Sequence, residues 1–375
     1  MLNKIRQLIK KYTRSQDTPS MRVEIAYLFW IKCLSDKKIL RILKIHGYQI
    51  EFKKLCIIRK SMGMYRRLTQ TEINDDADQK LQEIIEQELE RGNITLAGRR
   101  SVWMHLRNMG VLASHHRIGQ ALKIVDPIGV ENRLKGVNRH HAHFICPGPN
   151  WCWSIDGHLK LQMFGIEIYA AIDAYSRYVT WFYSGVSGKT GVSVLSQFLE
   201  VMQKQNCLPL HIRADRGTET MLLAESFWEL HKDHNPDITF PEVFWYGTST
   251  RNVRIESWWG QLTKGATADW KKYFRTLQQG NLFQEDRLED MIAILYTYMP
   301  IIRAKLHQFV ENWNNHKIRK QSNRPNLPTG EPYYNYYFPP DGVNNYEQIP
   351  SLNTIESIRD KKLKNSYTNE YYGIS

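Results

Sequence analysis

Three widely spaced carboxylates are the residues best suited to do chemistry. Asp156 lies in W-C-W-S-I-D-G-H-L-K, Asp215 in P-L-H-I-R-A-D-R-G-T-E-T, and Glu256 in S-T-R-N-V-R-I-E-S-W-W-G-Q-L. The first two runs are typical of strands that end in a carboxylate, and the third has the apolar spacing of a helix. Convergent carboxylate oxygens suit Mg²⁺. Two such ions about 3.5–4 Å apart can activate the attacking oxygen and stabilise the leaving oxygen of a phosphodiester.

The intervals between these carboxylates do not establish a site, because the chain holds 38 Asp and Glu and such triples arise by chance. The order of elements around them is stronger evidence, since three apolar runs at hairpin spacing are followed by alternating helices and strands. This order, β-β-β-α-β-α-β-α, predicts a ribonuclease H-like mixed sheet flanked by helices. The expected strands are 151–156, 166–173, 178–183, 209–214 and 243–246, and the expected helices are 190–204, 222–231 and the helix of Glu256.

Four motifs in this segment are W-S-I-D-G-H, A-I-D-A-Y-S-R-Y, R-A-D-R-G-T-E-T and N-V-R-I-E-S-W-W-G-Q-L-T-K. Together they resemble the catalytic core of retroviral integrases and D,D,E transposases, and Y-G-T-S-T is similar to eukaryotic integrase-core-domain proteins. The resemblance covers roughly residues 95–335. It implies that Asp156, Asp215 and Glu256 are catalytic and bind two Mg²⁺ ions, for which Mn²⁺ can substitute.

Five residues near the triad are candidate DNA contacts. His158 lies two positions beyond Asp156, so it is expected on the same side of the strand, where it could steady a phosphate or simply pack. Polar and basic side chains beside the other two carboxylates could hold the DNA backbone, and the family implies a DNA-contacting lysine beyond the glutamate. The candidates are His158, Arg216, Asn252, Arg254 and Lys264.

Other neighbours of the triad are expected to be structural. Asp173, in A-I-D-A-Y-S-R, is more readily a turn cap for Ser176 than an accessory carboxylate. Gly217 is expected to let the backbone turn tightly beside the second carboxylate. Trp258 and Trp259 are expected in the core rather than as platforms for bases.

Positive charge is concentrated in the first part of the 375-residue chain. Residues 1–70 hold 17 Lys and Arg against 4 Asp and Glu, an excess of 13 that equals the net charge of the whole chain. Basic side chains placed on phosphates release condensed counterions, so this region is expected to bind a polyanion. A solubilising basic surface is the alternative.

Residues 1–70 have the pattern of a helix-turn-helix. Segment 20–34 is a helix or a strand, and a helix capped by Ser35 or Asp36 then leads through a turn to a second helix that ends near Gly63. A small helical domain with a solvated basic face is the alternative. Phosphate contacts are expected from Lys53, Lys54, Arg59, Lys60, Arg66 and Arg67.

Residues 71–127 have a second such pattern. Helices are expected over 79–90, 98–109 and 114–124, which resembles the tri-helical helix-turn-helix found ahead of many transposase cores. The last helix would place polar residues in the major groove, and a structural bundle is the alternative. The expected DNA-facing residues are His115, His116, Arg117, Gln120 and Lys123.

Residues 128–150 are expected to form a linker, because Pro and Gly interrupt regular structure there. The linker holds His140, His141, His143 and Cys146, followed by Cys152. A zinc site is conceivable, but the spacing fits no closed tetrahedral pattern, which favours contacts with DNA. Five scattered cysteines fit a reducing compartment rather than a disulfide framework.

The core is expected over 151–268, with a helical extension over 269–332 that closes it and whose long helix, 287–316, is broken at Pro300. Residues 333–375 lack clear periodicity and are expected to be a partly ordered tail. No apolar run is long enough to predict a membrane span.

The combined hypothesis is a DNA integrase or transposase that cleaves the 3′ end of a mobile element and joins it to target DNA. Its partners would be double-stranded DNA, as element ends and as target, and at least one further copy of the chain. In a eukaryotic host the reaction would take place in the nucleus. The alternatives are a domesticated, non-catalytic DNA-binding protein and a ribonuclease H-like nuclease.

Overall fold

The structure is a computed structural model. It describes residues 18–66, 68, 72–91, 93–94, 98–127, 130, 146–247, 252–320 and 327–364. The chain forms two compact units, Met1–Arg139 with Asn315–Lys317, and His140–Asn314 with Ile318–Ser375. No helix among the described residues combines the length and the apolar character needed to span a bilayer.

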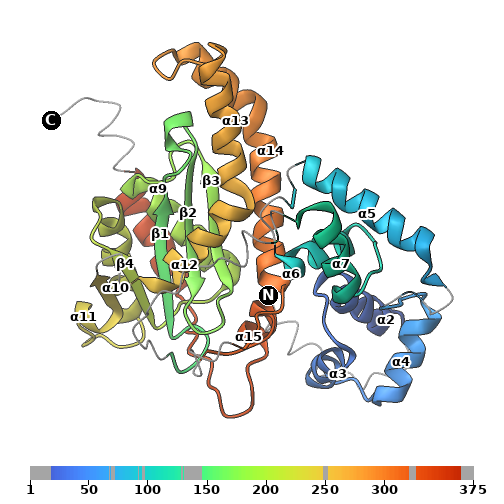
Figure 1. Cartoon of the computed structure of the whole chain (residues 1–375). Coiled ribbons are helices and arrows are strands. Elements are labelled where there is room, and N and C mark those ends of the chain that lie inside the picture. Colours follow the sequence, from blue (N-terminus) through green and yellow to red (C-terminus); the bar gives the residue numbers. More distant parts are fainter. Residues whose placement is uncertain are drawn as a thin grey trace. The chain divides into compact units, whose positions relative to one another are not determined.

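The described part of the N-terminal unit is helical (Figure 1). A π-helical turn (Tyr27–Ile31) continues the first helix, so the ambiguous segment 20–34 is helical. Helix α5 (Asp75–Glu90) starts before the expected residue 79 because the Asn74 side chain accepts the backbone N–H of Ala77 and caps it. The helices are α2 (Pro19–Ala26), α3 (Asp36–Ile45), α4 (Phe52–Ser61), α5 (Asp75–Glu90), α6 (Arg99–Asn108) and α7 (His115–Val125).

Both expected helix-turn-helix connections contain a glycine with positive φ, which side-chain-bearing residues rarely adopt. Gly47 (φ 88°) joins α3 to α4, and Gly110 (φ 84°) joins α6 to α7. The two helical regions, expected as separate domains, lie in one unit. Arg107 Nη2 on α6 donates to Phe29 O at 2.9 Å, and this bond links the two regions.

Two of the expected phosphate-binding arginines are held inside the unit instead. Arg59 is 6% exposed and its Nε lies 3.1 Å from Asp36 Oδ1. Arg66 pairs with the same carboxylate at 2.5 Å. The expectation for Arg59 is therefore wrong, because a buried and paired guanidinium cannot reach DNA, and Arg66 is largely committed to Asp36. Arg67 lies outside the described residues, and the remaining candidates, Lys53, Lys54 and Lys60, are exposed.

The second unit is built on a five-stranded sheet in the order β3-β2-β1-β4-β5. Strand β1 pairs antiparallel with β2, as β2 does with β3, whereas β1 and β4, and β4 and β5, pair in parallel. This mixed sheet confirms the ribonuclease H-like prediction. The strands are β1 (Cys152–His158), β2 (Glu167–Asp173), β3 (Val179–Gly185), β4 (His211–Asp215) and β5 (Phe244–Gly247).

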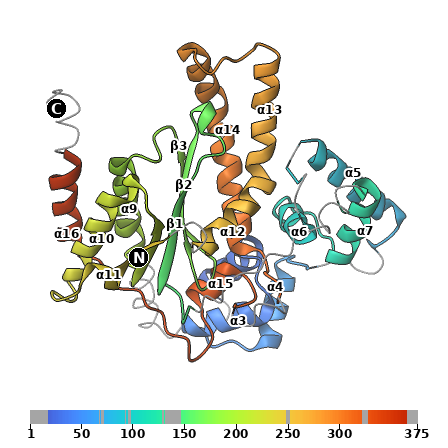
Figure 2. The same cartoon turned by 60° about the vertical axis from the view of Figure 1, so that its left-hand side comes forward.

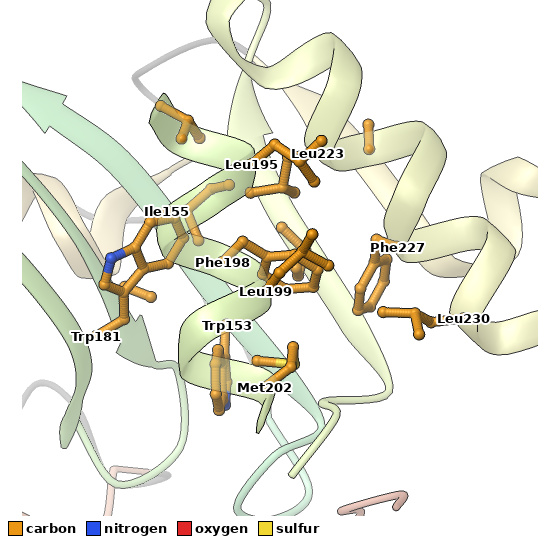
Figure 3. Close-up of a cluster of buried hydrophobic side chains, with 14 of the residues drawn as sticks. Trp153, Ile155, Trp181, Leu195, Phe198, Leu199, Met202, Leu223, Phe227 and Leu230 are labelled. Carbon is orange, nitrogen blue, oxygen red and sulfur yellow. The ribbon is translucent and has the colours of Figure 1, made fainter. Parts of the chain in front are cut away.

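Helices α9 (Gly191–Gln205) and α10 (Met221–Lys232) cover one face of the sheet (Figures 1 and 2). Side chains alternate along a strand, so Trp153 and Ile155 of β1 both point into this layer, where they meet Phe198 of α9 (Figure 3). Short helical turns complete the unit, namely Thr218–Thr220 and α11 (Phe240–Val243), and Gln162–Phe164, whose Phe164 packs on the other face of the sheet.

Helices α12 (Val253–Leu262), α13 (Ala268–Gln279) and α14 (Leu288–Asn315) cover the other face (Figure 2). A π-helical turn (Thr263–Thr267) joins α12 to α13. The predicted break at Pro300 is wrong, because α14 continues through it. Buried side chains before and after the proline anchor both halves to the core, which compensates for the lost backbone hydrogen bond. These side chains are Ile294, Met299, Ile302 and Leu306.

The described part of the C-terminal segment, which was expected to be a partly ordered tail, is helical in three places. It contains α15 (Pro332–Tyr337), α16 (Leu352–Ile358) and a π-helical turn (Arg359–Lys364). Ile355, Ile358 and Leu363 belong to the same buried cluster as α9 and α10. With so few apolar positions the segment shows no periodicity, yet its anchors complete the core.

Candidate active site

Strands β1 and β4 bring the two aspartates together. They are parallel neighbours, with Ser154 paired to Arg213. Continuing this register by two residues aligns Asp156 with Asp215. The residue directly before each aspartate points into the α9–α10 layer. Adjacent side chains of a strand point to opposite faces, so both carboxylates lie on the face of the sheet that α12 covers.

Glu256 reaches the same place from the first turn of α12. Ile255 of this helix is fully buried in the layer beneath it. At the start of the helix, Asn252 is 1% exposed and its Nδ2 donates to Ile155 O at 3.0 Å. This bond ties the beginning of α12 to the strand residue that precedes Asp156.

The negative charges of Asp215 and Glu256 both act on Asp156. Burial raises the pKa of Asp156 to about 7, and the negative charges of Glu256 and Asp215 add to this rise. The pKa of Glu256 is raised by burial and then by Asp215. The pKa of Asp215 is raised by burial and then by Glu219. Nearby negative charges disfavour ionisation, so this edge of the sheet is a place where a cation is favoured.

The donor set fits a hard divalent cation in kind, because it consists of three carboxylates. Asp215 Oδ1 is also buried without a hydrogen-bond partner, an arrangement that leaves a lone pair free for a cation. Among the described residues, however, no three His, Cys, Asp or Glu side chains lie close enough to hold a metal ion as they are oriented.

Trp259 belongs to the site, although the sequence predicted it only in the core. Its Nε1 donates to Asp156 Oδ2 at 2.9 Å, which opposes the rise in the pKa of that carboxyl. Trp259 lies one turn after Glu256 on α12. That spacing was the available signal, because positions three apart share a helix face.

Glu219 is a further acidic neighbour that sequence reasoning missed. It raises the pKa of Asp215, second to burial. The Glu219 carboxyl occupies the space of a side chain at Gly217, where a Cβ would lie 2.2–2.4 Å from it. Gly217 itself has φ −120° and ψ 147°, an ordinary extended conformation. The expected tight turn is present, because Gly217 N–H donates to Asp215 O at 2.9 Å, but it does not require a glycine conformation, and the glycine instead makes room for Glu219.

The five candidate DNA contacts of the core divide into two groups. Arg216 and Lys264 are exposed and available. His158 is 4% exposed and stacks on Trp259, with ring centres 4.8 Å apart. Burial lowers the pKa of His158 to about 4, so the neutral ring cannot offer a charge to a phosphate. Arg254 Nε donates to Ala174 O at 2.9 Å.

His158 and Asn252 therefore do not contact DNA, and the expectation for them is wrong, because both are buried against the elements that position the triad. Asp173 is the turn cap that was expected. It accepts hydrogen bonds from the backbone N–H and the hydroxyl of Ser176 and from the backbone N–H of Asn150.

In the N-terminal unit, Arg117 forms an ion pair with Asp78 at 2.7 Å and its side chain is 11% exposed. The expectation that Arg117 faces the groove is wrong for this conformation. His115, His116, Gln120 and Lys123 are exposed on α7. His140, His141 and His143 lie outside the described residues. Cys146 and Cys152 are buried free thiols whose pKa values burial raises.

A family model, described as integrase core domain, matches residues 143–329. Comparison with curated proteins found no match. The matched segment contains the whole sheet, the two aspartates and the helix of Glu256. Members of this family are generally polynucleotidyl transferases. Residues 143–329 therefore belong to the integrase core domain family and form a catalytic core of the retroviral type.

Proposed function

We propose that the chain is a DNA integrase or transposase that performs metal-dependent 3′-end cleavage and strand transfer of a mobile element. The observation that carries this proposal is the convergence of β1, β4 and α12: the register of β1 and β4 aligns Asp156 with Asp215, and Asn252 ties the start of the Glu256 helix to Ile155. Two strands and a helix, distant in sequence, supply these carboxylates. A structural role does not require three mutually repelling acids at one place.

As the family resemblance implies, Asp156 would hold both Mg²⁺ or Mn²⁺ ions, and Asp215 and Glu256 one each. The bound ions would activate the attacking oxygen and stabilise the leaving oxygen. In the first step water attacks a phosphorus atom and the 3′-oxygen leaves as a hydroxyl. In the second step that hydroxyl attacks a target phosphodiester, whose own 3′-oxygen leaves. Neither step attaches DNA covalently to the protein.

Double-stranded DNA is the proposed partner. Arg216 and Lys264 are exposed basic residues that follow Asp215 and Glu256 in sequence, and we assign them to phosphates of the reacting strands. Gln120 and Lys123 on α7 are assigned to the element end, as in the second helix of a helix-turn-helix. In a eukaryotic host this reaction would take place in the nucleus.

A joining assay tests the proposal. Duplex oligonucleotides with the terminal repeats that flank the coding region are incubated with supercoiled plasmid and Mg²⁺ or Mn²⁺. Wild-type protein should join the oligonucleotide to the plasmid, and Asp156→Asn should not. Asp233→Asn, which changes an exposed aspartate in the loop after α10, serves as the matched control and should join normally.

The outcome of these assays also distinguishes the proposed activity from the two alternative functions. DNA binding without metal-dependent cleavage would indicate a domesticated DNA-binding protein. Cleavage of an RNA–DNA hybrid without any joined product would indicate a ribonuclease H-like nuclease. Either outcome would overturn the proposed activity.

A further inference from the structure

The outer side of α14 carries an apolar ridge that the core does not use. Leu288 is 71% exposed, Ile292 57% and Tyr296 85%, and Pro300 and Ala304 are also exposed. These five residues, hereafter the α14 ridge, are four positions apart and therefore adjoin along the helix surface. Contiguous exposed apolar side chains of this size are typical of interaction sites.

The α14 ridge is separate from the packing that holds the helix on the sheet. The core-facing side of α14 is already buried through Ile294, Ile302 and Leu306. The hairpin of α13 and α14 also projects beyond the ends of the strands (Figures 1 and 2). A partner could therefore reach the ridge without disturbing the sheet.

We propose that the α14 ridge docks on the same ridge of a second copy of this chain, with the two helices antiparallel and a two-fold axis at Tyr296. Tyr296 is the middle residue of the ridge. An antiparallel arrangement therefore sets Ile292 against Pro300 of the other copy, so a large side chain meets a small one, while Leu288 and Ala304, each about 80° around the helix from Tyr296, lie at the edges of the contact. Two-fold interfaces use one patch that is complementary to itself.

Charges beside the ridge select this antiparallel orientation. Glu289 and Arg303 are both exposed and lie seven residues on either side of Tyr296. Within one helix they are about 21 Å apart at 1.5 Å per residue, too far to pair. In the antiparallel pair Glu289 of each copy lies nearest Arg303 of the other, whereas a parallel pair would oppose like charges. Arg303 Nε donates to Ser184 O at 2.9 Å, which fixes the position of its guanidinium.

This interface does not depend on the proposed catalytic function. It can be measured without DNA or metal, so a failure to associate and a failure to join DNA are distinguishable. If the chain does join DNA, the interface would bring two catalytic cores into one particle.

Sedimentation velocity of the full-length chain over a range of concentrations tests the interface. Wild-type protein should form a dimer, and Tyr296→Lys should weaken association by about tenfold or more, as for a central interface aromatic. Thr297→Lys adds the same charge to the next residue, about 100° around the helix, and should associate like wild type. Wild-type protein that stays monomeric, or a Tyr296→Lys dimer of unchanged affinity, would overturn the proposal.

A charge exchange tests the antiparallel arrangement. Glu289→Arg and Arg303→Glu should each self-associate poorly, because like charges then face each other. An equimolar mixture of the two variants should form a heterodimer, since each contact again joins Arg to Glu. A folding defect in either variant would not be repaired by mixing. A mixture that fails to associate would rule out this pairing.

Discussion

Trp259 Nε1 donates a hydrogen bond to Asp156 Oδ2 over 2.9 Å, which joins α12 to β1 at the centre of the proposed site. His158 stacks on the face of this indole, at a ring-centre distance of 4.8 Å and an interplanar angle of 21°. The Trp259 indole is therefore held in place by two residues of β1, Asp156 and His158. It fixes one oxygen of the carboxylate that would hold both ions.

Replacement of Trp259 by Phe should reduce DNA joining without unfolding the core. Loss of a hydrogen bond to a charged group costs about 1.5–3 kcal/mol, and the freed Asp156 carboxylate would need more cation for half-maximal activity. The measurement is joining activity against Mn²⁺ concentration.

Trp258→Phe is the matched control for that experiment. Trp258 is also buried in this layer, but its Nε1 has no hydrogen-bond partner. Trp258→Phe should therefore shift the Mn²⁺ requirement much less than Trp259→Phe. Equal shifts for the two variants would show that packing, not the bond to Asp156, matters.

Neutralising the Asp156 carboxylate should stabilise the metal-free protein. The pKa of Asp156 is raised by burial to about 7, so at pH 8 the folded state holds an ionised group that it disfavours. Asp156→Asn removes that charge and keeps an oxygen for Trp259. We expect a gain of about 1 kcal/mol, or roughly 2–4 °C in Tm, in thermal unfolding with a chelator present. A lower Tm than that of wild type would contradict this account of the site.

His231 should contribute to the loss of folding stability at acidic pH. It is fully buried on α10, and its Nε2 lies 3.0 Å from Pro209 O. Burial lowers the pKa of His231 to about 4 from an ordinary 6.5. Between pH 6.5 and pH 4, His231 therefore binds more protons in the unfolded chain than in the folded one. The folding stability that neutral His231 contributes above pH 6.5 is lost as the pH falls to about 4.

His231→Gln keeps a donor for Pro209 O but does not titrate. Urea unfolding from pH 7 to pH 4 should show a smaller loss of stability in His231→Gln than in wild type, by up to about 3 kcal/mol. His234→Gln changes an exposed histidine three residues later and should follow the wild-type curve. An unchanged slope in His231→Gln would contradict the assignment.

The C-terminal helix should matter for the stability of the core. Ile355 of α16 is fully buried among residues of α9 and α10. Ile355→Ala should lower the free energy of unfolding by about 2–5 kcal/mol, since it leaves a cavity. Leu352→Ala, at a 52% exposed position of the same helix, should cost far less. Similar losses in both variants would mean that α16 is not anchored as described.

The sequence by itself determined the order of strands and helices in the core and the identity of its three carboxylates. Alternation along β1 and helical spacing along α12 are local properties, because each depends on residues two to four apart. The Asp173 cap and the turns at Gly47 and Gly110 are local in the same sense, and they were predictable for that reason.

Only the tertiary structure decided which polar residues are free to act. Asn252, His158 and Arg117 each look like a DNA contact in sequence, but partners far away in the chain bury or pair them. Trp259 meets Asp156 across 103 residues. The continuity of α14 through Pro300 and the docking of Ile355 depend in the same way on surfaces formed by other elements. Such contacts arise from packing between distant segments, which no local spacing records.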